Sequence, residues 1–155
     1  MTNSALLTDL YELTMIQGYY LQDRNPRVIF DMFFRTQPFS SGFSIFAGLE
    51  TLLGNLAEFS FSDEDIEYLR STGLFRDEFL AFLRDFKFTG DVYAMDEGEV
   101  IFPGEPLLRV HSSLIEAQLI ESMLLNVVNF QSLVATKAAR IYLASNCGKL
   151  LEFGL

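Results

Sequence analysis

The sequence has no tryptophan, a single cysteine (Cys147), a single histidine (His111) and only 11 lysine and arginine residues among its 155 positions. One cysteine cannot form an internal disulfide, and one cysteine with one histidine is too small a set of ligands for a metal site. The formal net charge is -10 and no basic residues cluster, which argues against binding to nucleic acid or to an anionic membrane surface. These features are typical of a protein of the reducing cytoplasm.

Long apolar runs are missing as well. The longest uncharged stretch, residues 122–136, is shorter than the roughly 20 apolar residues of a membrane-spanning helix, and it contains Asn126, Asn129 and Gln131. The N-terminal residues show no basic segment followed by an apolar one, so the sequence predicts no secretory signal peptide. We therefore expect no association with a membrane.

The composition nevertheless supports a folded core. Half of the positions are hydrophobic, and they include 16 phenylalanines and 6 tyrosines. The chain is long enough for one domain, or for one domain and part of another. Segments with helical periodicity and segments with strand composition both occur, which predicts an α+β fold.

Capping residues, turn residues and the spacing of apolar side chains give the expected elements. Helices are predicted over residues 9–21, 48–59, 63–71 and 76–86, and strands over residues 28–34, 43–47, 91–95, 99–102 and 106–110. Thr8 is expected to cap the first helix, and Ser62 with Asp65 resembles a capping box. The first strand is apolar enough to be buried on both faces. The three strands between residues 91 and 110 predict a small β-sandwich-like module.

The last third of the chain is predicted to be helical until close to its end. A helix that starts at Ser113 should be followed by an antiparallel or angled partner over residues 130–144, which Gly148 ends. Residues 149–153 then have the composition of a strand. One strand after a helix pair would leave an unpaired edge, so Leu155 is not expected to be a natural domain end.

Signatures of common catalytic sites are missing. The sequence contains no G-x-G-x-x-G, no P-loop and no G-x-S-x-G motif. His111 has no evident catalytic partner and is interpreted as a structural or strand-end histidine, and Cys147 as an incidental thiol. The acidic groups at residues 63–65 and 96–97 are interpreted as a helix start and a solvated turn rather than as a metal site.

Seven short segments carry a more specific signal. They are LLTDLYELTM at 6–15, FFRTQPF at 33–39, FAGLE at 46–50, FPGEPLL at 102–108, EAQLIE at 116–121, NFQSLVATKAAR at 129–140 and EFG at 152–154. In this order and at this spacing they resemble the nicotinate phosphoribosyltransferases, and the match extends over essentially the whole chain. Several ordered motifs are far more specific than one short motif.

The resemblance implies a fold and an activity. Residues 1–145 would be the N-terminal α/β domain of a type II phosphoribosyltransferase, and residues 146–155 the first strand of an α/β barrel that is otherwise absent. Such enzymes are more than twice this length. They join nicotinate to phosphoribosyl pyrophosphate, release pyrophosphate, and hydrolyse ATP with Mg²⁺ through a transient phosphohistidine, expected beyond Leu155. His111 does not match that position, and no bound organic cofactor is implied.

The resemblance also implies binding residues. In related enzymes the tyrosine of the first motif reaches across the interface of a homodimer and stacks on the pyridine ring; here that residue is Tyr11. Phe153 would form the opposite wall, and Asp9 would order the helix start. Each stack on a flat substrate contributes about 1–3 kcal/mol by analogy with base stacking.

An anionic substrate and a polyphosphate also require fixed positive charge. Arg35, Lys137 and Arg140 are the candidates, with salt bridges on the surface or at an interface as the alternative role for each. Relatives that process quinolinate tend to carry an arginine directly after the glutamate that here is Glu121. Ser122 occupies that position, which argues against a substrate with two carboxylates.

Two other interpretations compete with the enzyme. The chain could be a non-catalytic module, derived from the same family, that dimerises or binds a planar ligand. The turns around residues 95–110 also resemble a lipoyl-type carrier domain. A carrier needs an exposed lysine at a hairpin tip, and no lysine lies between Lys87 and Lys137, so this last interpretation is rejected.

Overall fold

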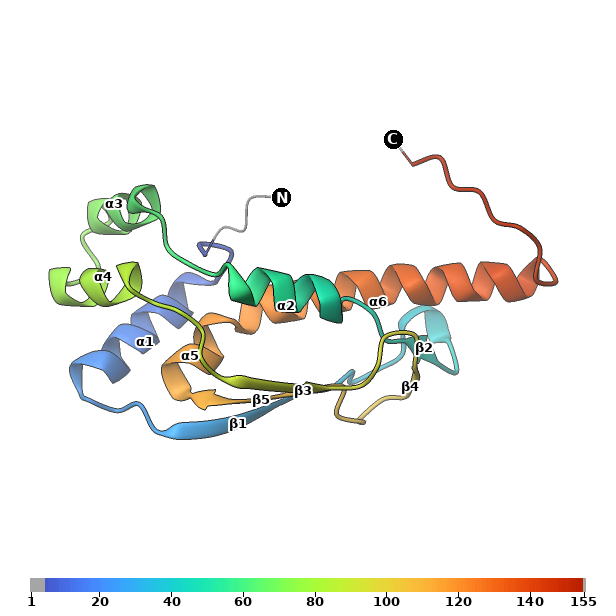
Figure 1. Cartoon of the computed structure of the whole chain (residues 1–155), viewed down its shortest axis with the longest axis horizontal. Helices are drawn as coiled ribbons and strands as arrows, with labels where there is room; N and C mark the ends of the chain where they lie inside the picture. The colour runs from blue at the N-terminus through green and yellow to red at the C-terminus, as the bar shows by residue number, and fades with distance from the viewer. Residues whose placement is uncertain (1–4, 155) are drawn as a thin grey trace.

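The structure is a computed structural model that describes residues 5–154 (Figure 1). Its helices are α1 (Leu10–Leu21), α2 (Leu49–Ala57), α3 (Asp63–Ser71), α4 (Asp77–Arg84), α5 (Leu114–Leu119) and α6 (Glu121–Ala144). Its strands are β1 (Arg27–Met32), β2 (Ser44–Ile45), β3 (Asp91–Ala94), β4 (Val100–Ile101) and β5 (Leu108–Ser113). A short 3-10 turn, η1, spans Pro38–Ser40. The predicted α+β fold class is confirmed.

The strands form two small antiparallel sheets. β5 is the centre of a three-stranded sheet in the order β1-β5-β3, and β2 pairs with β4. His111 of β5 lies opposite Ile29 of β1 and Asp91 of β3. The strands predicted between residues 91 and 110 therefore form, but they share both sheets with β1 and β2 instead of making a β-sandwich-like module by themselves. Their turns are local signals, whereas the choice of partner strand depends on long-range packing.

The hydrophobic core joins α1, α3 and α4 to the sheets. Phe79 of α4 is fully buried, and the rings of Phe59 and Phe86 meet edge to face with centroids 5.6 Å apart. The predicted capping box of α3 is confirmed. The Ser62 hydroxyl accepts a hydrogen bond of 3.1 Å from the backbone N–H of Asp65, and the Asp65 carboxylate accepts one of 2.9 Å from the N–H of Ser62.

β1 differs from its prediction, because it is not buried on both faces. Ile29 is 58% exposed and Phe30 is 36% exposed, and only Met32 at the end of the strand is buried. The strand also ends at Met32, before Arg35. Its composition is apolar enough for a central strand, but it lies at the rim of the sheet, where no other element of residues 5–154 pairs with its outer edge (Figure 1).

The predicted helix pair is wrong in its organisation. The break comes at Ile120, between the short helix α5 and the 24-residue helix α6, and α6 then continues without a turn through residues 128–129. No glycine or proline lies between Glu121 and Ala144, so nothing in that stretch opposes a helix.

The end of α6 also differs from the prediction. The helix stops at Ala144, and the left-handed backbone of Asn146 and Cys147 turns the chain before Gly148 is reached. Residues 148–154 follow without strand pairing and stand clear of the helices and sheets (Figure 1). The predicted strand over 149–153 is therefore not formed, and the boundary at residue 146 stays a prediction.

Hydroxyl side chains attach α6 to the segment around β2. The Ser132 hydroxyl accepts a hydrogen bond of 3.0 Å from the N–H of Ala47 and donates one of 3.1 Å to its carbonyl, and the Thr136 hydroxyl accepts one of 2.9 Å from the N–H of Ile45. Gly48 has a φ of 106°, and a Cβ there would lie 3.2 Å from the carbonyl oxygen of Val127. Small residues on both sides allow this close approach.

Candidate functional site

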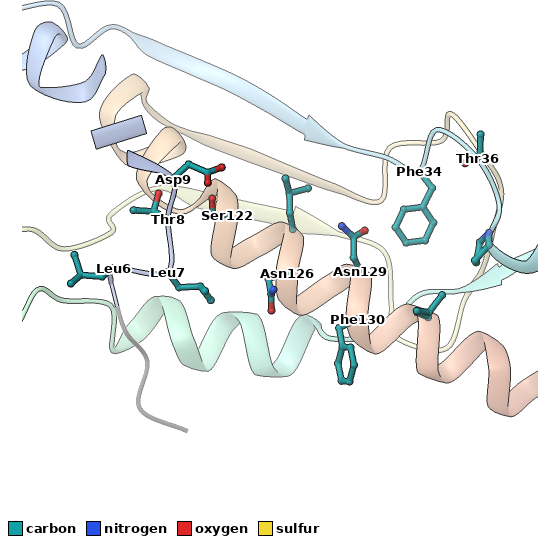
Figure 2. Close-up of a pocket in the computed structure, with 13 residues that line it drawn as sticks. Leu6, Leu7, Thr8, Asp9, Phe34, Thr36, Ser122, Asn126, Asn129 and Phe130 are labelled. Carbon is teal, nitrogen blue, oxygen red and sulfur yellow. The ribbon is translucent and has the colours of Figure 1, made fainter. Parts of the chain in front are cut away.

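An open cavity of about 820 Å³ lies along α6. Its lining comes from the segment before α1, from the loop after β1, and from one face of α6: Leu6, Leu7, Thr8, Asp9, Phe34, Thr36, Pro38, Ser122, Leu125, Asn126, Asn129, Phe130 and Leu133. Figure 2 shows Thr8 and Asp9 beside Ser122 at one end, and Phe34 and Thr36 at the other. We call this hollow the α6 cavity.

The walls of the α6 cavity suit a flat, partly polar ligand. Apolar side chains supply most of the surface, and Phe34 and Phe130 add aromatic rings. The amides of Asn126 and Asn129 project from α6 between the two ends (Figure 2). Apolar walls with a few placed polar groups are the usual composition of small-molecule sites.

Glu12 fixes the end of the cavity next to α1. Its side chain is 2% exposed, and its carboxylate accepts hydrogen bonds from the hydroxyl of Thr8 and, at 3.2 Å, from the hydroxyl of Ser122. A buried carboxylate needs such donors, because burial without them would strongly disfavour its charge. The three residues join the segment before α1, α1 itself and α6 at one point.

Thr8 therefore does not cap α1 as predicted. Asp9 occupies the N-cap position, and its side chain makes no capping hydrogen bond. Thr8 lies one residue too early, and its hydroxyl donates to Glu12 instead. Asp9 is exposed and lines the α6 cavity, so it remains available at the helix start.

Tyr11 lies beside this buried carboxylate but points outward. Its side chain is 56% exposed, so its ring is not used in the core of its own chain. The charge of Glu12, followed by partial desolvation and the charges of Glu121 and Asp9, raises the pKa of the Tyr11 phenol above its ordinary value. Burial, followed by the charge of Glu12, likewise raises the pKa of Glu121. Tyr11 is therefore an exposed, neutral ring on an acidic helix start.

Phe153 lies far from Tyr11 within the chain. Glu121, the first residue of α6, is close enough to influence Tyr11 electrostatically, whereas Phe153 follows the other end of the helix. A helix of 24 residues spans about 36 Å. Phe153 is 85% exposed on the segment that stands clear of the molecule. A single chain in this structure does not bring the two rings together.

The three predicted basic residues are all exposed. Arg140 donates a hydrogen bond of 3.3 Å to the carbonyl oxygen of Phe39, and its guanidinium lies 5.6 Å from the centroid of that ring. This contact supports η1, where Phe39 has a φ of 59°. Arg35 and Lys137 make no ion pair within residues 5–154. Arg140 therefore has a structural contact, and the other two remain available for an anion.

The remaining titratable residues do not assemble into a metal centre. Among residues 5–154, no group of three or more histidine, cysteine, aspartate or glutamate side chains could hold a metal ion. His111 lies in the middle of β5 with its ring 4.9 Å from that of Tyr93, and Cys147 is an exposed free thiol. Mg²⁺ therefore stays a prediction from the resemblance.

Sequence reasoning missed the polar stripe of α6 and its contact with Glu12. Ser122, Asn126 and Asn129 follow one another at spacings of four and three, which places them on one helical face. That signal was present in the sequence. It was missed because a second helix was expected to begin only at residue 130, which left Asn129 in the connection between two helices and hid the continuous face.

Comparison with known proteins identifies the family. The model of the nicotinate phosphoribosyltransferase (NAPRTase) N-terminal domain matches residues 6–129. The chain belongs to the nicotinate phosphoribosyltransferase family. The resemblance carried by the seven short motifs is thereby confirmed.

Individual relatives agree over nearly the whole chain. A nicotinate phosphoribosyltransferase of Mycobacterium tuberculosis is 43% identical over 150 residues, which cover 97% of this chain and 32% of the relative. The nicotinate phosphoribosyltransferase of Bacillus subtilis is 45% identical over 151 residues, which cover 97% of this chain and 31% of the relative. The crystal structure of human nicotinic acid phosphoribosyltransferase superposes with a TM-score of 0.86 at 40% identity. The superposition covers 96% of this chain and 31% of the human chain. The chain thus spans about a third of the length of these family members.

Among the described residues, no helix combines the length and the apolar composition that crossing a membrane requires.

Proposed function

We propose that this chain is the N-terminal part of a cytoplasmic enzyme of NAD salvage, which joins nicotinate to phosphoribosyl pyrophosphate with ATP hydrolysis and forms nicotinate mononucleotide and pyrophosphate. Family membership supports the reaction type. The observation that carries the proposal is the exposed ring of Tyr11, which the buried contact between Glu12 and Ser122 holds at the start of α1.

Tyr11 binds the pyridine ring by stacking. Its phenol stays protonated at neutral pH, so the aromatic face adds no charge that would repel the nicotinate carboxylate. Asp9 and Glu121 lie near the same helix start, and their negative charge disfavours a ligand carboxylate pointing toward them. Nicotinate is therefore oriented with its carboxylate away from α1 and toward a cation, for which Arg35 and Lys137 are the candidates. Lys137 lies sixteen residues along α6 from Glu121, about 24 Å, so it would serve from the second chain of a dimer.

The second wall of the site comes from another subunit. Tyr11 and Phe153 flank opposite ends of α6 in one chain, and both rings are largely exposed. A homodimer in which Tyr11 of one chain meets Phe153 of the other would enclose the ring between two flat side chains and align it for attack on the ribose. ATP, Mg²⁺ and the phosphohistidine remain predictions from the resemblance.

A second candidate function rests on the α6 cavity. Because its walls are mostly apolar and carry the amides of Asn126 and Asn129, a non-catalytic module that binds a planar ligand or dimerises is the alternative. Substrate dependence distinguishes the two. The gene product, purified at its native length, should release pyrophosphate from phosphoribosyl pyrophosphate when nicotinate is added, and much less with nicotinamide or quinolinate. Nicotinate binding without any pyrophosphate release would favour the module.

A further inference from the structure

Glu121 places a carboxylate close to the start of α1. It is the first residue of α6, and the hydroxyl of the next residue, Ser122, donates a hydrogen bond of 3.2 Å to the carboxylate of Glu12. This contact joins the first turn of α6 to the turn of α1 that carries Tyr11. Figure 2 shows Ser122 beside the segment that leads into α1. Glu121 therefore has a fixed place relative to the Tyr11 ring.

The carboxylate of Glu121 adjoins open space. The residue is half-buried and lines a cavity of about 330 Å³ between β1, β5 and the first turns of α6. Apolar side chains make up most of that lining, among them Phe30, Met32 and Leu124. Apolar surroundings screen a charge less than water does, so the charge of Glu121 acts over a longer distance than that of a carboxylate in solvent.

The charge of Glu121 is disfavoured in the folded chain. Burial, followed by the charge of Glu12, raises the pKa of its carboxyl above the ordinary value. Titratable groups with shifted pKa values that lie in a cleft are concentrated at functional sites. A role in the chemistry of the adjacent Tyr11 site is therefore a more specific interpretation of Glu121 than a role in the fold.

The groups that act on Tyr11 through their charge are all acidic. The charge of Glu12, followed by partial desolvation and the charges of Glu121 and Asp9, raises the pKa of the Tyr11 phenol. The carboxylate of Glu12 is already bound by two hydroxyls. Glu121 and Asp9 are thus the charges that can act on a bound molecule, and a ring stacked on Tyr11 lies in a negative potential.

The proposed reaction creates a positive charge on that ring. The lone pair of the pyridine nitrogen forms a bond to the anomeric carbon of the ribose, and the bond from this carbon to pyrophosphate oxygen breaks with its electron pair. Pyrophosphate leaves, and the ring becomes a pyridinium cation. The nitrogen is meta to the carboxylate of nicotinate. When the carboxylate points away from α1, the nitrogen therefore lies in the half of the ring that faces α1.

We propose that Glu121 stabilises the positive charge that the pyridine ring gains as its bond to the ribose forms. This inference rests on the proposed function and assigns a further residue to the same site. A carboxylate that the fold already holds in place stabilises a developing cation without reorganising. It stabilises the transition state more than the uncharged ring of the substrate, so Glu121 raises kcat with little effect on the KM for nicotinate.

Ligand binding tests this role without catalysis. N-methylnicotinate has the ring and the carboxylate of nicotinate and carries a permanent pyridinium charge. Isothermal titration calorimetry measures the affinity of the gene product, at its native length, for each compound. Glu121→Gln should weaken the binding of N-methylnicotinate by about tenfold and should not weaken that of nicotinate. Glu64→Gln removes the same charge from an exposed position on α3 and should change neither affinity.

Kinetics of pyrophosphate release provide the second measurement. Glu121→Gln should lower kcat by about tenfold at an unchanged KM for nicotinate, and Glu121→Asp, which keeps the charge, should recover part of the loss. Thermal unfolding checks that both variants are folded. A purely structural role would weaken the binding of both compounds together.

The outcomes separate this inference from the proposed function. Equal changes in the two affinities, a wild-type kcat for Glu121→Gln, or a wild-type protein that binds nicotinate but not N-methylnicotinate would overturn the role of Glu121 and leave the proposed function intact. A wild-type protein that releases no pyrophosphate when nicotinate is added would overturn both.

Discussion

Ser122 on α6 donates a hydrogen bond of 3.2 Å to the buried carboxylate of Glu12 on α1, the residue that follows Tyr11. Thr8 donates to the same carboxylate from the segment before the helix. Glu12 therefore determines where the start of α1 lies relative to α6. The exposed ring of Tyr11 takes its position from this contact.

Removing the Glu12 carboxylate should destabilise the fold. Glu12→Ala leaves the half-buried hydroxyls of Thr8 and Ser122 without their acceptor, so the free energy of unfolding should fall by about 1–2 kcal/mol. Urea denaturation followed by circular dichroism measures the change. Glu12→Gln keeps an acceptor oxygen at the same place and should lose less. Equal losses for both variants would show that the negative charge of Glu12, and not an acceptor oxygen alone, is required.

Glu121 should make stability depend on pH. Its folded-state pKa is raised by burial and by Glu12, so folding favours its protonated form. The stability that this gives is fully present below the ordinary glutamate pKa and is lost as pH rises through the folded-state pKa. Glu121→Gln should therefore be more stable than the wild-type chain at pH 7, and the difference should vanish in acid. A difference that grows in acid contradicts the shifted pKa.

The close approach of α6 to β2 should tolerate no added side chain at Gly48. Gly48→Ala puts a Cβ at a φ of 106° and within 3.3 Å of Gln131 Cβ, so unfolding should become easier by about 1–3 kcal/mol. Gly54→Ala is the matched control, because Gly54 lies within α2 with open space around its Cα. It should stabilise the chain slightly, since alanine favours helices. Thermal unfolding of both variants measures the contrast.

Ser132 should contribute more to the stability of the fold than its small side chain suggests. Ser132→Ala deprives both the N–H and the carbonyl of Ala47 of their hydrogen-bond partner, so stability should fall by about 1–3 kcal/mol. Ser145→Ala removes a hydroxyl that is exposed beyond α6, and it should change stability much less. Denaturation of the two variants side by side provides the measurement, and similar losses would contradict a specific role for Ser132.

Local signals in the sequence predicted most of the elements, whereas arrangements set over long distances were missed. The Ser62 capping box and the helices around it depend on neighbouring residues, and they were confirmed. The pairing of β5 with β1 joins residues about eighty positions apart, and nothing local to either strand specifies it. The burial of Glu12 likewise depends on Ser122, which the sequence places 110 positions away.

The candidate site shows the same contrast between what the sequence predicted and what it missed. Tyr11 was identified through a family resemblance, and its exposure could not be read from the alternation of residues around it. The α6 cavity required a continuous α6, and the prediction of two helices removed it from view. The strand composition of residues 149–153 is real, but pairing requires a neighbouring strand that the described residues do not supply.

The most direct test of the central claim is activity complementation between two inactive variants of the gene product at its native length. Tyr11→Ala and Phe153→Ala are purified separately, then mixed, unfolded and refolded together, and nicotinate-dependent pyrophosphate release is measured. If the site is shared, half of the dimers are mixed and carry one intact site, so about a quarter of the wild-type rate should return. Wild-type rates for either variant alone, or no recovery in mixtures shown to contain mixed dimers, would contradict the shared site.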